Sequence, residues 1–303
     1  PGARAGAGRR RGGTPTALAR TTTADLREFH RTRYTVDNAF LVVVGDTTRA
    51  EVEALLGKHL AAFPRRPAGF RAPTWKEPSP RAAAPEIVLV DRPGAAQSVV
   101  AAVAPAPLTL VPLDGPTEAM NTLLGGSFMS RLNQNLREDK QYAYGARSAF
   151  DLRPGANVFV ASTSVATPVT APGLVEVRRE LERIRTYIED NESQRAAGYR
   201  ALTFPAAFET GGAVASRWAW AHLRGVSDAS VTSFPERVLS TTPRSMLDAA
   251  RKNLALQGLR FVVVGDGAAI GDELRKLHLG DVRELHPDVL LPPAPPAPSA
   301  TRR

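Results

Sequence analysis

One pentapeptide occurs twice in this chain, and the distance between its copies constrains the fold. Val42-Val-Val-Gly-Asp46 recurs as Val262-Val-Val-Gly-Asp266, an offset of 220 residues, and at that offset eight of the 26 residues from 21 to 46 are identical. In both copies a pair of threonines, an N-cap signal, precedes a helix and then the apolar segment. This order indicates a repeated folding unit. The alternative is two unrelated apolar strands that both end in Gly-Asp.

The offset also predicts that the two copies differ in completeness. The second copy begins near residue 86 and runs to 287, so its counterpart would need about 130 residues upstream of Pro1. We therefore expect residues 14–63 to be the C-terminal part of a first domain and 86–287 to be a complete second domain. The missing part lies upstream, or another chain supplies it, or 14–63 docks on the second copy.

The remaining segments carry the composition of linkers and tails. Residues 1–13 are rich in Gly and Arg, residues 64–85 in proline and charge, and residues 288–303 in proline. None has an apolar period, so we expect a flexible basic tail, a linker and a disordered tail respectively.

Apolar spacing predicts alternating helices and strands, which places the chain in the α/β class. Thr22 and Asp25 form a capping-box signal for the first helix. The expected elements are a strand at 40–44, a helix at 49–63, strands at 86–91 and 98–103, helices at 117–124 and 127–138 hinged at Gly125-Gly126, a hairpin of 144–152 and 158–165 with Pro154-Gly155 in its loop, a helix at 173–191, and helical segments at 194–223 and 229–239.

Composition excludes several classes of protein. Of the net charge of +9, five positive charges are arginines in residues 1–20 and two are Arg302 and Arg303, which leaves +2 for 21–301. A net charge of only +2 over residues 21–301 argues against nucleic-acid binding by this part of the chain. Binding through the Arg-rich N-terminal tail remains an alternative. Cysteine is absent, so a thiol nucleophile and a Cys-ligated zinc are excluded. The longest apolar stretch, 99–113, contains three prolines and is too short for a transmembrane helix.

Self-contained catalytic motifs are missing from the sequence. The five histidines are never four residues apart, so neither His-x-x-Glu-His nor its inversion occurs, and Gly-x-Ser-x-Gly is absent as well. Gly125-Gly126-Ser127 lacks the Lys-Ser/Thr of a phosphate loop, and Gly265-Asp266-Gly267 lacks the later glycine of a dinucleotide site. We therefore predict no metal ligands and no cofactor in this chain, and expect Gly125-Gly126 to permit close helix packing.

A longer motif resembles a known family. Gly125-Gly-Ser-Phe-Met-Ser-Arg-Leu132 is followed by Leu136-Arg-Glu138 and by Tyr142-Ala-Tyr144. This pattern is similar to that of the insulinase/pitrilysin family of zinc metallopeptidases, in the domain that does not bind the zinc. Phe204-Pro with Glu209-Thr, and the segment 242–266, match the family too, so the resemblance covers about 14–287.

The resemblance implies an α+β sandwich whose paired domains close like a clamshell. It also implies that zinc is held by His-x-x-Glu-His in the missing part of the first domain, and that Arg137 and Tyr144 face the metal and grip a peptide carbonyl. The local alternative pairs Arg137 with Glu138 or Asp139 and half-buries Tyr144 in a strand. Ser130 and Arg131 are expected to fix helix packing.

Taken with this resemblance, the sequence predicts the substrate-gripping portion of a zinc metalloendopeptidase, with a peptide substrate and a zinc-bearing domain or subunit as partners. Whether the chain is itself an enzyme stays open, because the zinc motif is absent. One alternative is a non-catalytic structural or assembly subunit, and another is nucleic-acid binding through the tail. The resemblance alone favours an exported or periplasmic protein, and the high Ala, Arg and Pro usage suggests a bacterial one.

Overall fold

The computed structural model describes residues 15–67, 86–107, 109–152 and 157–286. These residues fall into two compact units, which are described separately below. The first unit comprises 15–67 and 206–225, and the second comprises the rest of the described chain. The predicted tails 1–13 and 288–303, most of the predicted linker 64–85, and the Pro154-Gly155 loop lie outside the described residues. The predicted boundaries of the domains stay a prediction.

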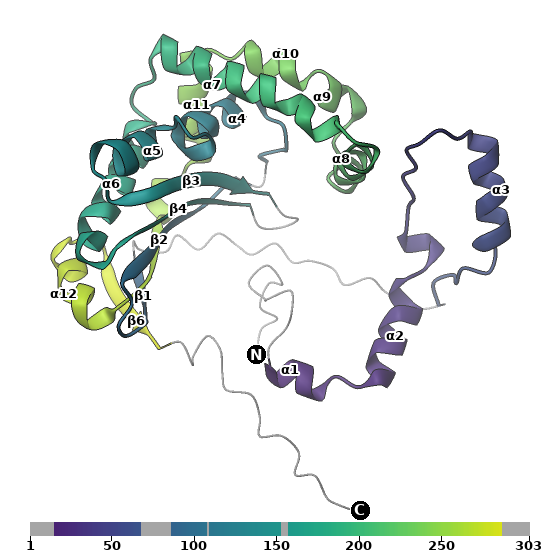
Figure 1. Ribbon diagram of the computed structural model, residues 1–303, viewed down its shortest axis with the longest axis horizontal. Helices are drawn as coiled ribbons and strands as arrows, with labels where there is room; N and C mark the ends of the chain where they lie inside the picture. Colours follow the sequence, from purple (N-terminus) through teal and green to yellow (C-terminus); the bar gives the residue numbers. More distant parts are fainter. Residues whose placement is uncertain (1–14, 68–85, 108, 153–156, 287–303) are drawn as a thin grey trace, which may run out of the picture. The chain divides into compact units, whose positions relative to one another are not determined.

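The first unit consists of short helices (Figure 1). Their bounds are α1 Pro15–Arg20, α2 Thr23–Arg33, the 3-10 helix η2 Val36–Asn38, α3 Arg49–His59 and α8 Gly211–Leu223. Thr22 caps α2, and its side chain accepts a hydrogen bond from the backbone N–H of Asp25 at 3.2 Å, which confirms the predicted capping box. Helix α3 begins as expected but ends at His59 rather than at residue 63.

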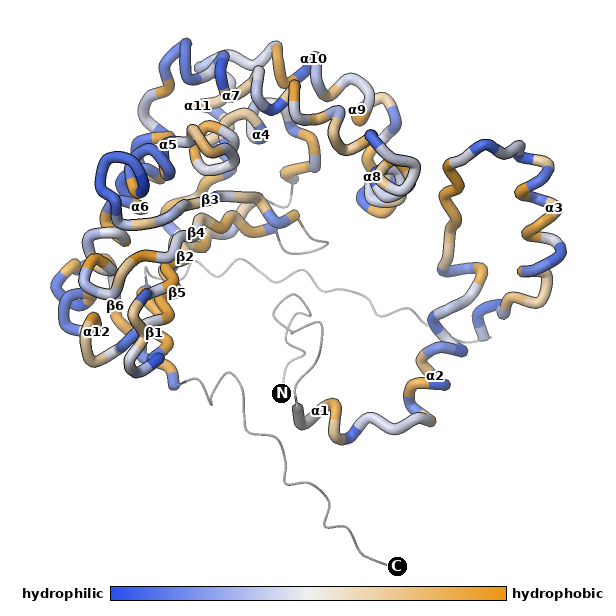
Figure 2. The backbone as a smooth tube through the Cα atoms, in the orientation of Figure 1, coloured by the Kyte–Doolittle hydropathy of each residue, from blue (hydrophilic) through white to orange (hydrophobic). Residues whose placement is uncertain are grey.

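The predicted strand at 40–44 is wrong. These residues form no strand, although Figure 2 colours the segment that leads into α3, where they lie, as hydrophobic. Four of the five side chains are exposed, with Leu41 at 61%. A strand requires a neighbour for its backbone hydrogen bonds, and this segment has none among the described residues. Phe40 instead packs on His222 of α8, with ring centroids 4.4 Å apart.

The second unit is built on one mixed sheet of six strands in the order β3-β4-β2-β5-β1-β6. The strands are β1 Glu86–Asp91, β2 Gln97–Pro105, β3 Ala143–Asp151, β4 Val158–Ala166, β5 Arg260–Gly265 and β6 Asp281–Leu285. β1 runs parallel to β5 and to β6, whereas β2, β3 and β4 pair antiparallel. The predicted hairpin is confirmed as β3 and β4.

Helices of this unit cover one face of the sheet (Figure 1). They are α4 Gly115–Asn121, α5 Arg131–Asn133, α6 Thr170–Arg183, α7 Asp190–Thr203, α9 Asp228–Thr232, α10 Phe234–Leu239, α11 Pro243–Asn253 and α12 Gly267–Lys276, with π-helical turns η3 Thr122–Gly126 and η4 Gln134–Asp139 and 3-10 turns η5 Thr167–Val169 and η7 Leu256–Gly258. The 3-10 turn η6 Phe204–Phe208 begins in this unit, and its last three residues belong to the first. The mixed sheet covered by helices confirms the α+β class that the family resemblance implies.

Strand alternation separates the covered face from the open one. In β2, Ser98, Val100, Ala102 and Ala104 are buried, whereas the residues between them are partly or fully exposed. Successive strand residues point to opposite faces, so the buried set lies under the helices and Val99, 45% exposed, lies on the open face. The core therefore sits between the helices and one side of the sheet.

The predicted hinge at Gly125-Gly126 takes an unexpected form. Helix α4 passes into the π-helical turn η3, and after a break at 127–130 helix α5 passes into the π-helical turn η4. A Cβ atom on Gly125 would lie 2.6 Å from the backbone nitrogen of Ser148 in β3 and 2.9 Å from Leu132. Gly125 therefore allows a close approach, as expected, but chiefly between the helical layer and the sheet.

Candidate functional site

The structure brings Arg137 and Tyr144 together in the second unit. The Arg137 guanidinium lies over the Tyr144 ring at 5.4 Å and over the Phe128 ring at 4.2 Å, measured from Cζ to each ring centroid. Distances of this size permit cation–π attraction, which restrains a long side chain. The three side chains come from η4, β3 and the break after η3, so a single cluster joins three parts of the motif.

The backbone turns sharply between the two members of the pair. Arg137 lies in η4, and Gln141 follows with φ of 57°, in the left-handed region. The register of β3 against β4 then shifts between Ala143 and Ala146, which marks a bulge at Tyr144 and Gly145. A bulge re-aims the side chains beside it. The turn and the bulge together position the Tyr144 ring beside the guanidinium.

Asn133 holds this bulge, although the sequence did not single it out. Its buried amide donates from Nδ2 to the carbonyl of Ala146 at 2.9 Å and accepts at Oδ1 from the Ala146 N–H at 2.8 Å. The side chain thus pairs with β3 as a neighbouring strand would. Phe128 was also missed as a member of the site, and its only sequence signal was an aromatic residue within the glycine-containing motif.

The exposure of Tyr144 differs from the half-buried position that the local alternative predicts for it. Tyr144 is 92% exposed rather than half-buried, and the Arg137 side chain is 30% exposed. The other part of that alternative is present, because Arg137 Nε lies 3.3 Å from Glu138. Arginine has five N–H donors in a fixed fork, so one contact with Glu138 leaves donors for another acceptor.

An open cavity of about 570 Å³ lies beside Tyr144. Side chains of β2, β3 and β4 line it, among them Val99, Thr163 and Ser164. Its volume falls within the usual range for ligand sites. The arrangement therefore offers a phenol donor at a cavity on the sheet and a guanidinium over the same tyrosine ring, two donors that can bind a carbonyl oxygen and stabilise negative charge on it.

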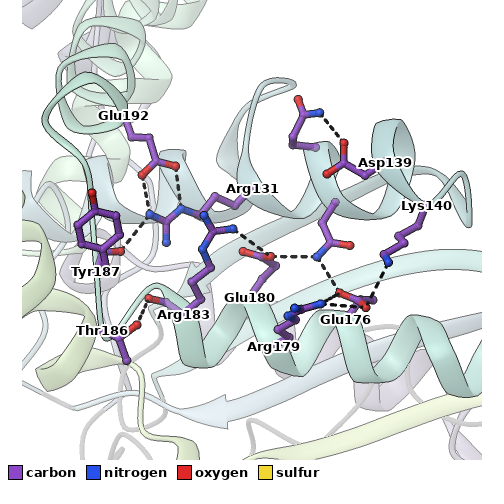
Figure 3. Close-up of polar contacts among 12 residues, drawn as sticks. Arg131, Asp139, Lys140, Glu176, Arg179, Glu180, Arg183, Thr186, Tyr187 and Glu192 are labelled. Carbon is purple, nitrogen blue, oxygen red and sulfur yellow. Dashed lines mark hydrogen bonds and ion pairs between the residues drawn. The ribbon is translucent and has the colours of Figure 1, made fainter.

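Arg131 has the structural role that the sequence predicted. Only 5% of its side chain is exposed, and it binds Glu192 of α7 through two hydrogen bonds of 2.9 and 2.5 Å and the Tyr187 carbonyl at 3.0 Å (Figure 3). Burial raises the pKa of Glu192, but the hydrogen bond and charge of Arg131, together with the Glu189 backbone N–H and the charge of Arg183, outweigh burial and lower that pKa below its ordinary value of 4.5. Ser130 is likewise buried, and its Oγ accepts a hydrogen bond from Asn133.

Metal-ligating side chains do not converge within the described ranges. No group of three His, Asp or Glu residues there has the arrangement of a metal site. His30 stacks on Tyr34 with ring centroids 4.8 Å apart, and His222 contacts Phe40. The donor set in this part of the chain therefore does not fit a zinc ion. No helix among the described residues combines the length and apolar character that crossing a bilayer requires.

Comparison with known proteins gives one family and one fold. The family model described as the peptidase M16 inactive domain matches residues 20–198, more than half of the chain. No curated protein matches the chain.

Similar solved structures include a peptidase M16 inactive domain from Pseudomonas fluorescens (20% identity, TM-score 0.70) and a protease from Helicobacter pylori (21%, TM-score 0.72). Both matches cover 82% of this chain, which spans only 58% and 60% of those two proteins. The periplasmic protease PqqL from Escherichia coli is also similar, with 15% identity and a TM-score of 0.66 over 82% of this chain and 28% of PqqL. These likenesses show a shared fold.

Proposed function

Because this chain belongs to the family of peptidase M16 inactive domains, we propose that it is the non-zinc-binding, substrate-gripping part of a zinc metalloendopeptidase. In this proposal the zinc ion and the residues that hold it belong to another domain or subunit. The ion would polarise the peptide bond there, and this chain would bind the peptide from the opposite side.

The observation that carries the proposal is the stacked pair Arg137 and Tyr144. Tyr144 presents its hydroxyl at an open cavity, and Phe128 and Glu138 restrain the Arg137 guanidinium that lies over the Tyr144 ring. Donors that are already oriented stabilise charge on a carbonyl oxygen without reorganisation during the reaction. An exposed tyrosine beside a restrained arginine is therefore suited to gripping a peptide carbonyl.

The segment 40–44 supports the second part of the proposal, that a zinc-bearing domain is the partner. Its apolar side chains are exposed, and it has no strand partner among the described residues. Its repeat counterpart, Arg260–Val264, lies inside the six-stranded sheet as part of β5, between β1 and β2. We propose that 40–44 takes the same place in the sheet of the first domain.

The proposal is tested on the complete enzyme, obtained by co-producing this chain with its zinc-bearing domain. We expect Arg137→Ala to lower kcat/KM for peptide cleavage by about 10²–10³-fold, because a charged donor to the developing oxyanion is lost. Tyr144→Phe, which removes only the hydroxyl, should lower it about tenfold or more, and zinc content should not change in either variant.

Arg178→Ala and Tyr187→Phe are the matched controls, since these partly exposed residues of the same unit lie outside the cluster and should leave kcat/KM unchanged. Unchanged cleavage by both site variants would contradict the gripping role and favour a non-catalytic assembly subunit. If this chain alone bound stoichiometric zinc and cleaved peptides, the assignment of the zinc ion to another domain or subunit would be contradicted.

A further inference from the structure

A second cavity of about 620 Å³ lies in the helical layer, away from the sheet. Residues of η4, α6 and α7 line it, together with Arg131, and Figure 3 shows the polar contacts among several of them. Its lining side chains carry five positive and three negative charges. The volume falls within the range of small-molecule sites, and the charged lining suits a polar ligand.

Three buried polar atoms of residues that line this cavity have no hydrogen-bond partner among the described residues. They are Arg131 Nη1, a donor, and Asn135 Oδ1 and Glu180 Oε2, both acceptors. The orientation of the Asn135 amide is set, because its Nδ2 donates to Glu176 and to Glu180 at 2.9 Å each. Burial of unpaired polar groups is costly, so a bound species should supply one acceptor and two donors.

Most charges around these atoms are already paired. Glu192 binds Arg131, Glu180 lies 3.6 Å from Arg183, and Glu176 lies near Lys140 and Arg179. Arg195 on α7 is exposed and makes no ion pair with the described part of the chain. It is therefore the available cation at the mouth, and an anionic group is the ligand that it would attract.

A smaller, largely apolar cavity of about 90 Å³ adjoins the first. Both cavities are lined by Met129, Glu192 and Arg195. The rest of its lining is mainly hydrophobic, and includes Leu123 and Tyr199. At about 30 Å³ per water, this space equals roughly three waters and suits a short aliphatic side chain. An apolar slot and a polar cavity thus meet at Arg195.

We propose that the two cavities together bind an apolar α-amino acid residue with a free carboxylate. The carboxylate accepts from Arg195 and from Arg131 Nη1, the ligand's N–H groups donate to Asn135 Oδ1 and Glu180 Oε2, and its side chain enters the smaller cavity. A free amino acid and the last residue of a peptide share this chemistry. The site does not rest on the proposed function: it uses neither Arg137 nor Tyr144, although Phe128, which contacts Arg137, also lines the smaller cavity.

Two simpler ligands fit the same lining less well. Inorganic phosphate satisfies the arginines, but as an acceptor-rich anion it is repelled by the Glu180 carboxylate. A metal cation satisfies the two acceptors but faces Arg131, Arg183 and Arg195. Only a ligand with both an anionic acceptor and N–H donors matches all three unpaired atoms.

Isothermal titration calorimetry on the full chain tests the site with four probes: acetyl-Ala-Leu, its C-terminal amide, free leucine and inorganic phosphate. We expect acetyl-Ala-Leu to bind at least about tenfold more tightly than the amide, because the amide lacks the charge-assisted hydrogen bonds. Equal or tighter binding of free leucine assigns the site to amino acids, and weaker binding assigns it to peptide C-termini. Equal binding of the amide, tighter binding of phosphate, or no binding by any probe overturns the proposal.

Variants then locate the binding. Arg195→Gln should weaken acetyl-Ala-Leu binding about tenfold or more, and Arg92→Gln, a matched loss of charge at an exposed residue outside both cavities, should leave it unchanged. Acetyl-Ala-Gly, which lacks the aliphatic side chain, should also bind about tenfold more weakly. An unaltered affinity in Arg195→Gln would show that the ligand binds elsewhere.

Discussion

At the scale of single residues, burial decides what each arginine can do. Arg131 and Arg137 lie six positions apart, yet Arg131 is enclosed by Glu192 and the Tyr187 carbonyl, while Arg137 lies over two aromatic rings near the surface. A buried charge needs a partner, whereas a partly exposed one keeps donors free for a ligand. The two residues therefore serve structure and recognition respectively.

Glu192→Gln should lower the free energy of unfolding by about 3 kcal/mol at neutral pH, because it leaves the buried Arg131 charge unpaired. The pKa of Glu192 is lowered in the folded state, so its stabilisation is full above its ordinary value of 4.5 and is lost as pH falls through the lowered pKa. Urea unfolding at a series of pH values measures this, and the two proteins should converge in acid.

Asp248→Asn provides the control, since its pair with Arg244 is exposed on α11 and should contribute less than about 1 kcal/mol. A Glu192→Gln effect as small as that of the control would contradict the inferred role of the buried pair.

At the scale of elements, the helical layer bends where it meets the sheet. The π-helical turns η3 and η4 flank the break that carries Phe128, and Gly125 at the end of η3 approaches β3. Such turns often mark functional sites in helices. Apolar spacing predicted two regular helices here, because a period of 3.6 residues does not reveal an extra residue in one turn.

Gly125→Ala should destabilise the second unit by about 1–3 kcal/mol, because the added Cβ would lie 2.6 Å from the Ser148 nitrogen and from its Oγ. Gly198→Ala, inside α7 with no atom within 4 Å of its added Cβ, should instead stabilise by about 0.5–1 kcal/mol. Urea unfolding followed by circular dichroism compares the two. Equal effects of the two substitutions would show that the close approach is not a constraint.

At the scale of the whole molecule, the two copies of the repeat show that the same residues form a strand only where neighbouring strands are present. Val262–Val264 in β5 have β1 and β2 on either side, whereas Val42–Val44 have no strand partner among the described residues. Identical side chains thus occupy different structures, because a strand is stabilised by its neighbours and not by its own sequence.

Hydrogen exchange should reveal this difference. In the chain alone, the amides of 42–44 should exchange rapidly, and on addition of a zinc-bearing first domain they should slow by at least about tenfold, because strand pairing protects them. The amides of 262–264, with the same side chains, should be protected in both states. Unchanged exchange at 42–44 in a complex that does form would contradict the proposed place of this segment.

Local spacing and contiguous motifs were enough to predict the capped helices, the β3–β4 hairpin, the family resemblance with the α+β class that it implies, and the packing role of Arg131. The tertiary structure decided the rest. Phe128 against Arg137, Asn133 against β3, Arg131 with Glu192 and the two joined cavities all depend on which elements become neighbours. Residues 61 positions apart in the chain, such as Arg131 and Glu192, leave no periodic signal of their pairing. Long-range contacts of this kind arise from the packing of whole elements, and no local pattern encodes them.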